Sequence, residues 1–156
     1  DYLVNLGGNM RCAGTRDSDG GAWRVAVRNP LKELEDEPLG MLMLTNGMAV
    51  ATSGNYEQHY EYEGRRYSHI IDPRTGEPAN GVAQVTVVAN TAMDADALST
   101  TCFVLGAEAS RGLIEAHPDF GALFVLVDDA GLLKFEMMGV FAECFEPETD
   151  GLENEQ

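Results

Sequence analysis

The chain has 156 residues, which suits one domain, because a single core of this size buries about 68–70% of the surface that an unfolded chain exposes. Asp and Glu number 26 and Lys and Arg number 10, for a formal net charge of −16. That balance excludes a general nucleic-acid or anionic-membrane surface, since both polyanions attract clustered cations. A polyanionic ligand would need a local cation, and a bound divalent metal ion is one way to supply it.

Short apolar runs bounded by glycine and turn residues predict strands along most of the chain. In chain order these runs are residues 2–6, 10–13, 23–27, 41–44, 60–67, 85–89, 123–127 and 133–137. We expect residues 60–67 to form a hairpin that turns at Glu63 and Gly64. Residues 123–127 are apolar on both faces, which predicts a central strand.

Two predicted helices interrupt the strands. The first covers residues 92–105, because Thr91 with Asp94 three residues later is a capping-box start and Gly106 is a natural stop. The second covers residues 108–116 and ends before a proline. Strands, a helical pair and a final hairpin predict an α+β fold, a mainly antiparallel sheet with helices packed on one face.

The chain is predicted to be one domain over residues 1–145, followed by an acidic tail at residues 146–156. That tail is poor in large apolar residues, so we expect it to be disordered. The three cysteines are odd in number and widely spaced. They fit neither a disulfide framework nor a zinc site.

Asp96 and Thr100 on the first predicted helix are the first candidate for chemistry. Their spacing places a carboxylate and a hydroxyl on one helix face. Mg²⁺ commonly takes only one or two protein carboxylates and completes its shell with water and substrate phosphates. The pair is therefore compatible with a phosphate-bound Mg²⁺, although the same spacing also occurs on solvated polar faces.

Residues 68–78 (S-H-I-I-D-P-R-T-G-E-P) form the second candidate, and two prolines and a glycine predict an ordered turn here. His69 and Asp72 are close enough in sequence to hydrogen-bond, which would set the imidazole tautomer. In a functional interpretation His69 is a general base and Arg74 a phosphate contact. In a structural one both residues hold the loop in place.

Two glycine-containing segments are further candidates for ligand contacts. In residues 51–56 (A-T-S-G-N-Y), small hydroxyl residues beside Gly54 would let backbone N–H groups approach a phosphate or a ring edge. Taken alone, this segment favours a turn. Gly7 and Gly8 follow a predicted strand and permit a tight reversal or a ligand lying against the backbone.

The order of these segments resembles a known family more closely than any one of them does. V-N-L-G-G-N, A-T-S-G-N-Y, S-H-I-I-D-P-R-T-G-E-P, V-T-V-V-A, A-D-A-L-S-T and F-V-L-G occur in this order over about residues 4–127. This series resembles the ApbE family of FAD:protein FMN transferases. The H-x-x-D-P-x-T-G block followed by A-D-A-x-x-T is its most specific part.

The resemblance implies a T-fold-like enzyme that uses Mg²⁺ and FAD, transfers FMN to a Thr or Ser hydroxyl of a partner protein and releases AMP. The implied partner is a flavin-accepting redox protein, such as a subunit of an ion-pumping NADH:quinone reductase. The alternatives are a non-catalytic FAD-binding module, an FAD pyrophosphate hydrolase, and a structural or interaction domain that keeps the scaffold and has lost the ligand. The resemblance further suggests the bacterial periplasm or the outer face of the cytoplasmic membrane, with any membrane attachment through a lipid anchor outside this chain.

Residue roles follow position by position from the resemblance. Asp96 and Thr100 match the side-chain Mg²⁺ ligands, and His69 matches the motif histidine, a candidate for activating the acceptor hydroxyl. The segments that frame the flavin correspond here to Gly7, Gly8, Asn9, Ser53, Gly54 and Tyr56. With Arg74 as a phosphate contact, these residues complete the predicted FAD-binding set.

The chain departs from the family in length. Family members are much longer, and their N-terminal half carries a K-G-x-x-x-D segment that adds a backbone Mg²⁺ ligand. Nothing in this chain matches that segment. We therefore expect a C-terminal portion of such a protein, or one piece of a split protein whose missing partner is the N-terminal half. Such a piece would show the architecture in part and would be inactive if its metal coordination were incomplete.

Overall fold

A computed structural model describes residues 1–31, 37–55, 59–62, 65–128 and 132–148. The strands in chain order are β1 (Tyr2–Leu6), β2 (Asn9–Ala13), β3 (Trp23–Val27), β4 (Gly40–Leu44), β5 (Ala49–Gly54), β6 (His59–Tyr62), β7 (Arg65–Ser68), β8 (Gln84–Ala89), β9 (Gly121–Val127), β10 (Leu133–Gly139) and β11 (Phe145–Pro147). The helices in the same residues are α1 (Ala92–Leu105), α2 (Ala107–Glu115) and the 3-10 turn η1 (Val140–Glu143).

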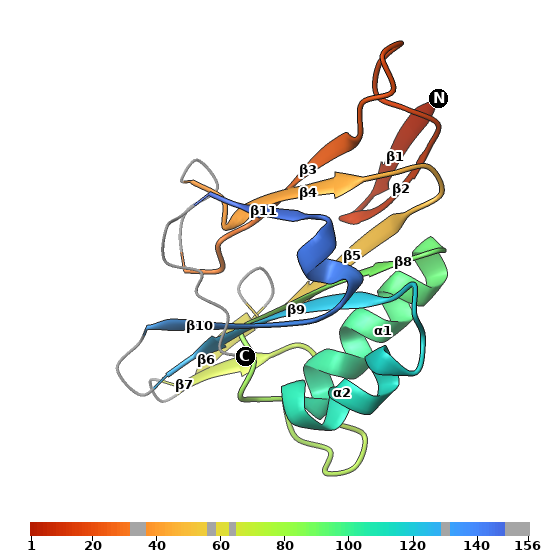
Figure 1. Ribbon diagram of the computed structural model, residues 1–156. Helices are drawn as coiled ribbons and strands as arrows, with labels where there is room; N and C mark the ends of the chain where they lie inside the picture. Colours follow the sequence, from red (N-terminus) through yellow and green to blue (C-terminus); the bar gives the residue numbers. More distant parts are fainter. Residues whose placement is uncertain (32–36, 56–58, 63–64, 129–131, 149–156) are drawn as a thin grey trace.

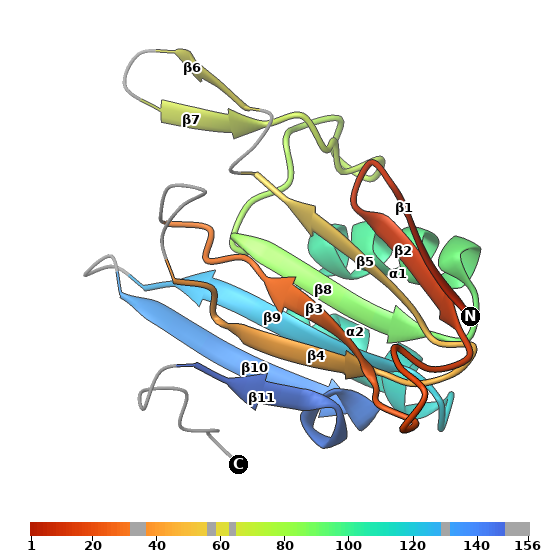
Figure 2. The ribbon, with the colours of Figure 1, turned by 90° about the horizontal axis from the view of Figure 1, so that it is seen from above.

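The elements stack in layers (Figure 1). A six-stranded antiparallel sheet in the order β1-β2-β5-β8-β9-β10 is the middle layer. Helices α1 and α2 cover one face, and a three-stranded sheet, β11-β4-β3, covers the other. Figure 2 shows the β6–β7 hairpin extending from one end of this stack. The predicted class, a mainly antiparallel sheet with helices on one face, is confirmed.

Strand β8 shows why the large sheet lies in the middle. Its side chains alternate between the two faces. Val85 and Val87 pack with Cys102 and Phe103 of α1, whereas Val88 packs into the core beneath the three-stranded sheet. All three valines are fully buried, and burying such a side chain stabilises the fold by about 1.5–3 kcal/mol. Both faces of the sheet therefore contribute to stability.

Several predicted elements are confirmed. α1 begins after Thr91, whose hydroxyl accepts a hydrogen bond from the Asp94 N–H at 3.0 Å, and it ends at Gly106. β9 lies between β8 and β10, as expected for a strand that is apolar on both faces. The pairing of β6 with β7 confirms the hairpin, while its turn at residues 63–64 lies outside the described residues.

Residues 51–54 differ from the expectation that they turn, because they belong to strand β5. The alanines of this strand explain the difference. Ala49 and Ala51 are buried against Ala95 of α1, and side chains this small let the helix lie close to the sheet. Their own sequence signals a turn only weakly, and the tertiary contact with α1 decides the conformation.

The end of the domain also differs from the predicted boundary at residue 145. β11 continues through Glu146 and Pro147, which pair with Met41 and Gly40 of β4. The fold therefore extends into the first part of the predicted acidic tail. Residues 149–156 lie outside the described residues, so the predicted disorder there stays a prediction.

The cysteines are all free thiols: Cys12 and Cys102 are buried and Cys144 is half-buried. This agrees with the expectation that they form no disulfide framework.

Among the described residues, no helix has the length and apolar surface that crossing a bilayer would require.

Candidate functional site

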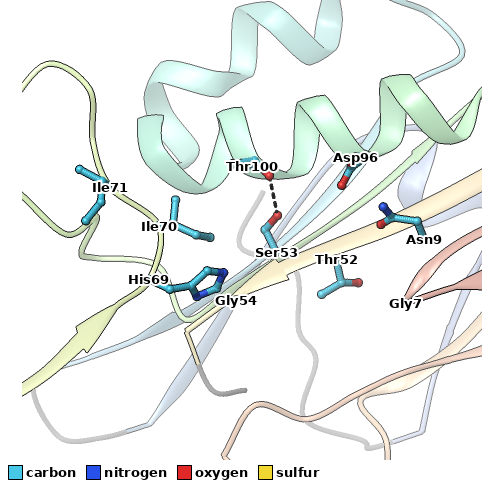
Figure 3. Close-up of a pocket in the computed structure, with 10 residues that line it drawn as sticks. All are labelled: Gly7, Asn9, Thr52, Ser53, Gly54, His69, Ile70, Ile71, Asp96 and Thr100. Atoms are coloured by element: carbon cyan, nitrogen blue, oxygen red, sulfur yellow. Dashed lines mark hydrogen bonds between the residues drawn. The ribbon is translucent and has the colours of Figure 1, made fainter. Parts of the chain in front are cut away.

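A cavity of about 520 Å³ opens where β2 separates from β5 (Figure 3). The ladder between these strands joins Met10 to Val50 and Arg11 to Ala49, and then ends. β5 continues to Gly54 beside α1, so this part of its edge faces the cavity. The residues that line it come from four segments: Gly7, Asn9, Thr52, Ser53, Gly54, His69, Ile70, Ile71, Asp96 and Thr100.

The turn between β1 and β2 forms one rim of the cavity. Gly7 and Gly8 have φ values of +64° and +96°, in the left-handed region that side chains disfavour. The Gly8 N–H donates to Asn5 Oδ1 at 2.9 Å and fixes the turn. Gly7 and Asn9 face the cavity, whereas Gly8 is not among its lining residues. The tight reversal expected from the glycine pair is what the structure shows.

Helix α1 supplies Asp96 and Thr100, which both line the cavity. Their neighbours Ala95 and Ser99 are buried against the sheet, while Asp96 and Thr100 are exposed. The four-residue spacing thus places one carboxylate and one hydroxyl on the same side of the helix. Neither side chain is sealed in the apolar core.

Ser53 of β5 lies directly beneath Thr100, and its side chain is buried. Ser53 Oγ lies 3.1 Å from Thr100 Oγ1 and 2.9 Å from Ser99 Oγ. Ser99 was not identified from the sequence as a candidate site residue. Its place directly before Thr100 in A-D-A-L-S-T was the available signal, but only the contact with Ser53 Oγ shows that Ser99 belongs to the site.

His69 reaches the cavity from the loop after β7. In Figure 3 its imidazole stands on the other side of Ser53 from Asp96. The loop is ordered, as two prolines and a glycine predict: the Ile70 N–H donates to Ser68 Oγ at 3.0 Å. The backbone N–H of Asp72 donates to the Glu77 carbonyl at 2.8 Å. His69 is exposed on this ordered loop, so a molecule bound in the cavity would reach its imidazole.

Arg74 is engaged within its own loop. Its Nη2 lies 2.7 Å from Asp72 Oδ2, and its Nε lies 2.9 Å from Asp72 Oδ1. These hydrogen bonds hold the pKa of Asp72 below its usual value and raise the pKa of Arg74. Arg74 lines a neighbouring cavity of about 530 Å³, which shares Ile71 and Thr100 with the first one. Arg74 therefore holds its own loop in place, as the structural interpretation expects. Its contact with a phosphate stays a prediction.

The structure therefore brings most of the predicted site residues to one place: Gly7, Asn9, Ser53, Gly54, His69, Asp96 and Thr100. Gly8 and Arg74 lie near this cavity without lining it, and Tyr56 lies outside the described residues. Thr52, Ile70 and Ile71 also line the cavity. They belong to the two candidate segments, but none of them was assigned a role of its own from the sequence.

The donor set of the cavity fits a magnesium ion. Among the described residues, no three His, Cys, Asp or Glu side chains gather where they could hold a metal. Asp96 and Thr100 instead offer one carboxylate and one hydroxyl, both hard oxygens. Mg²⁺ accepts such a sparse protein shell because water and substrate phosphates supply its other ligands.

Fold and cavity together define the class of this protein: an α+β domain with an oxygen-lined pocket at the edge of its large sheet. The sequence profile of the ApbE family matches residues 1–124. The chain belongs to the ApbE family.

Curated relatives and solved structures agree with this assignment. The chain is 38% identical over 130 residues to the FAD:protein FMN transferase of Vibrio cholerae and 40% identical over 134 residues to that of Treponema pallidum. These alignments cover 83% and 81% of this chain but 38% and 36% of the relatives. The chain thus spans less than half the length of the relatives it matches.

The crystal structure of the ApbE protein from Thermotoga maritima superimposes with a TM-score of 0.76 at 35% identity, covering 93% of this chain and 45% of that one. The apo form of the flavinyl transferase ApbE from Pseudomonas stutzeri gives a TM-score of 0.72 at 34% identity. It covers 94% of this chain and 44% of that one. The fold described above is therefore an ApbE fold.

Proposed function

We propose that this chain carries the metal- and flavin-binding part of a Mg²⁺-dependent FAD:protein FMN transferase. The reaction moves FMN from FAD to a Thr or Ser hydroxyl of a flavin-accepting redox protein and releases AMP. One observation carries the proposal: Asp96, Thr100 and His69, from two separate sequence blocks, line a single cavity together with Ser53 and Gly54. The names of the relatives support the same reaction.

In this reaction the acceptor oxygen attacks the phosphorus of the FMN half of FAD. A new phosphoester bond forms, the bond to the bridging oxygen of the diphosphate breaks, and AMP leaves with that oxygen. The proton of the acceptor hydroxyl goes to a base, for which His69 is the candidate in the cavity. A positioned base typically accelerates such a step by about 10²–10⁴-fold.

Asp96 and Thr100 are the residues that would hold Mg²⁺, which when bound neutralises the charge of the diphosphate. This matters for a chain with a net charge of −16, which would otherwise repel an anionic dinucleotide. Gly7 and Gly54 line the cavity and have no side chain, so a ligand could lie against their backbone. These residues position the ligand, which contributes to the rate by orienting the reacting atoms.

The test incubates the protein with FAD, Mg²⁺ and the flavin-accepting subunit of an ion-pumping NADH:quinone reductase. Covalent flavin is measured by fluorescence after denaturing electrophoresis. Because the chain is shorter than its relatives, a chimera in which it replaces the matching region of the Vibrio cholerae relative is assayed beside it. Failure of both proteins to flavinylate the acceptor would contradict the proposal. Free FMN alone would indicate an FAD pyrophosphate hydrolase, and unchanged FAD a binding module.

Substitution Asp96→Ala in the active protein should abolish flavin transfer. Asp96 is exposed, so we expect the free energy of unfolding to change by less than about 0.5 kcal/mol. Glu108→Ala is the matched control, because Glu108 is an exposed acid on α2 outside the cavity. Normal transfer by the Asp96→Ala variant would show that the metal assignment is wrong.

A further inference from the structure

Behind Thr100 lies a chain of hydroxyl groups that connects the cavity to the backbone of α1. Thr100 Oγ1 contacts Ser53 Oγ at 3.1 Å, and Ser53 Oγ contacts Ser99 Oγ at 2.9 Å. Ser99 Oγ in turn lies 3.0 Å from the carbonyl oxygen of Asp96. Ser99 is 1% exposed and Ser53 is 9% exposed, so both side chains are shielded from bulk water.

The number of hydroxyl hydrogens fixes which residue donates in each of these hydrogen bonds. Each hydroxyl has one hydrogen to donate. The carbonyl of Asp96 can only accept, so the Ser99 hydroxyl donates to it. Ser99 must then accept from Ser53, and Ser53, with its hydrogen used, must accept from Thr100. The hydrogen of Thr100 therefore points at Ser53, and its lone pairs take the remaining directions.

We propose that Ser53 and Ser99 are positioning residues that set the orientation of the Thr100 hydroxyl as a cation ligand. This inference rests on the proposed function, in which Thr100 and Asp96 hold Mg²⁺. A neutral hydroxyl binds a cation through its lone pairs, and its hydrogen must point elsewhere. The chain that ends on the Asp96 carbonyl satisfies this condition before any ion arrives. The same residue, Asp96, thus ends the chain with its carbonyl and lines the cavity with its carboxylate.

Removing one hydroxyl from this hydrogen-bonded series leaves the orientation of the Thr100 hydroxyl unfixed. In Ser99→Ala the Ser53 hydrogen loses its acceptor and becomes free to bond Thr100, which turns the Thr100 hydrogen toward the cavity. In Ser53→Ala the Thr100 hydroxyl loses its partner altogether. Neither variant alters a charge or a proposed metal ligand. Residues that orient a metal ligand typically change metal affinity by about 10–100-fold when they are replaced.

A second pair of hydroxyls shows that contact alone does not produce this arrangement. Thr52 Oγ1 lies 2.9 Å from Thr86 Oγ1, and Thr86 Oγ1 accepts from Gln84 Nε2 at 3.3 Å. That bond uses a lone pair of Thr86 and leaves its hydrogen free, so either threonine can donate to the other. The direction of the Ser53–Ser99 chain is instead fixed by a carbonyl.

The experiment measures the affinity for Mn²⁺, a spectroscopic substitute for Mg²⁺, in the presence of FAD by electron paramagnetic resonance. It uses the protein or chimera that is active in the transfer assay. We expect Ser99→Ala and Ser53→Ala to weaken Mn²⁺ binding by about 10-fold or more. The conservative variant Ser53→Thr, which keeps a hydroxyl, should recover most of the affinity.

Ser110→Ala is the matched control for the loss of a buried hydroxyl. Ser110 is fully buried on α2 and donates to the Gly106 carbonyl at 2.7 Å, away from the cavity. Its replacement should lower the melting temperature about as much as Ser99→Ala does and leave Mn²⁺ affinity unchanged. Unchanged affinity in both Ser99→Ala and Ser53→Ala would overturn the inference while leaving the proposed function standing. Absence of Mn²⁺ binding by the unsubstituted protein would overturn the proposed metal site itself.

Discussion

Two neighbouring turns of α1 face the same sheet but contact it with different chemistry. Toward its C-terminus, Cys102 and Phe103 are buried among the valines of β8. One turn earlier, Ser99 and Thr100 meet the hydroxyl of Ser53 at the edge of β5. The first contact removes apolar surface from water, whereas the second leaves oxygen atoms facing a cavity. Stability and ligand binding are therefore assigned to neighbouring turns of one helix and can be separated by mutation.

Phe103→Ala tests the apolar end and should have the largest effect on stability. Phe103 is 1% exposed, and removing a buried ring of this kind costs about 3–5 kcal/mol through lost burial and the cavity that remains. Urea unfolding measures the loss. Met93→Ala on the same helix is the control, since Met93 is 78% exposed and should change stability by less than about 0.5 kcal/mol. Equal losses in the two variants would contradict the division of α1 described above.

His69→Ala tests the cavity side and should reduce flavin transfer by about 10²–10⁴-fold, the usual contribution of a positioned base. FAD affinity, followed by flavin fluorescence, should change much less than the rate. His117→Ala is the control, because His117 stacks on Phe120 with ring centroids 4.6 Å apart and lies outside the cavity. A rate unaffected by His69→Ala would remove His69 from the mechanism.

Alkaline pH should lower the free energy of unfolding, because the fold buries thiols that ionise in the unfolded chain. Burial raises the pKa of Cys102, and it raises the pKa of Cys144 to about 11. The unfolded chain ionises its thiols from about pH 8.5, while the folded chain keeps them neutral. Stability is therefore full below that pH and falls as pH rises toward about 11. Urea unfolding at pH 8 to 10 measures the slope, which Cys144→Ala should flatten, and a pH-independent stability would contradict the expectation.

Gly112→Ala should have the smallest effect and the opposite sign. Gly112 lies inside α2, and a Cβ atom added there meets no atom within 4 Å. Replacing glycine by alanine in a helix interior stabilises it by about 0.5–1 kcal/mol. Gly121→Ala is the contrasting substitution, because its Cβ would lie 2.3 Å from the Phe141 backbone nitrogen. Thermal unfolding should show a rise for the first and a fall for the second.

Local sequence determined the elements whose physics is local. Thr91, Asp94 and Gly106 set the ends of α1, because capping satisfies backbone groups within a few residues. The four-residue spacing of Asp96 and Thr100 placed both on one helix face, since the helical period is fixed. The glycine pair at residues 7–8 determined the tight β1–β2 turn in the same way.

Tertiary structure alone decided which of these segments meet. The bond between Ser53 and Ser99 joins residues 46 positions apart, and no periodicity in the sequence encodes such a pairing. Residues 51–54 became part of β5 because α1 packs on Ala51 and on Ala49 of the same strand. The three-stranded sheet formed through β4, which pairs with both β3 and β11. Secondary-structure propensity and the spacing of apolar residues act only between residues that are close in sequence. The cavity arises instead from long-range burial, which is settled only when the layers pack together.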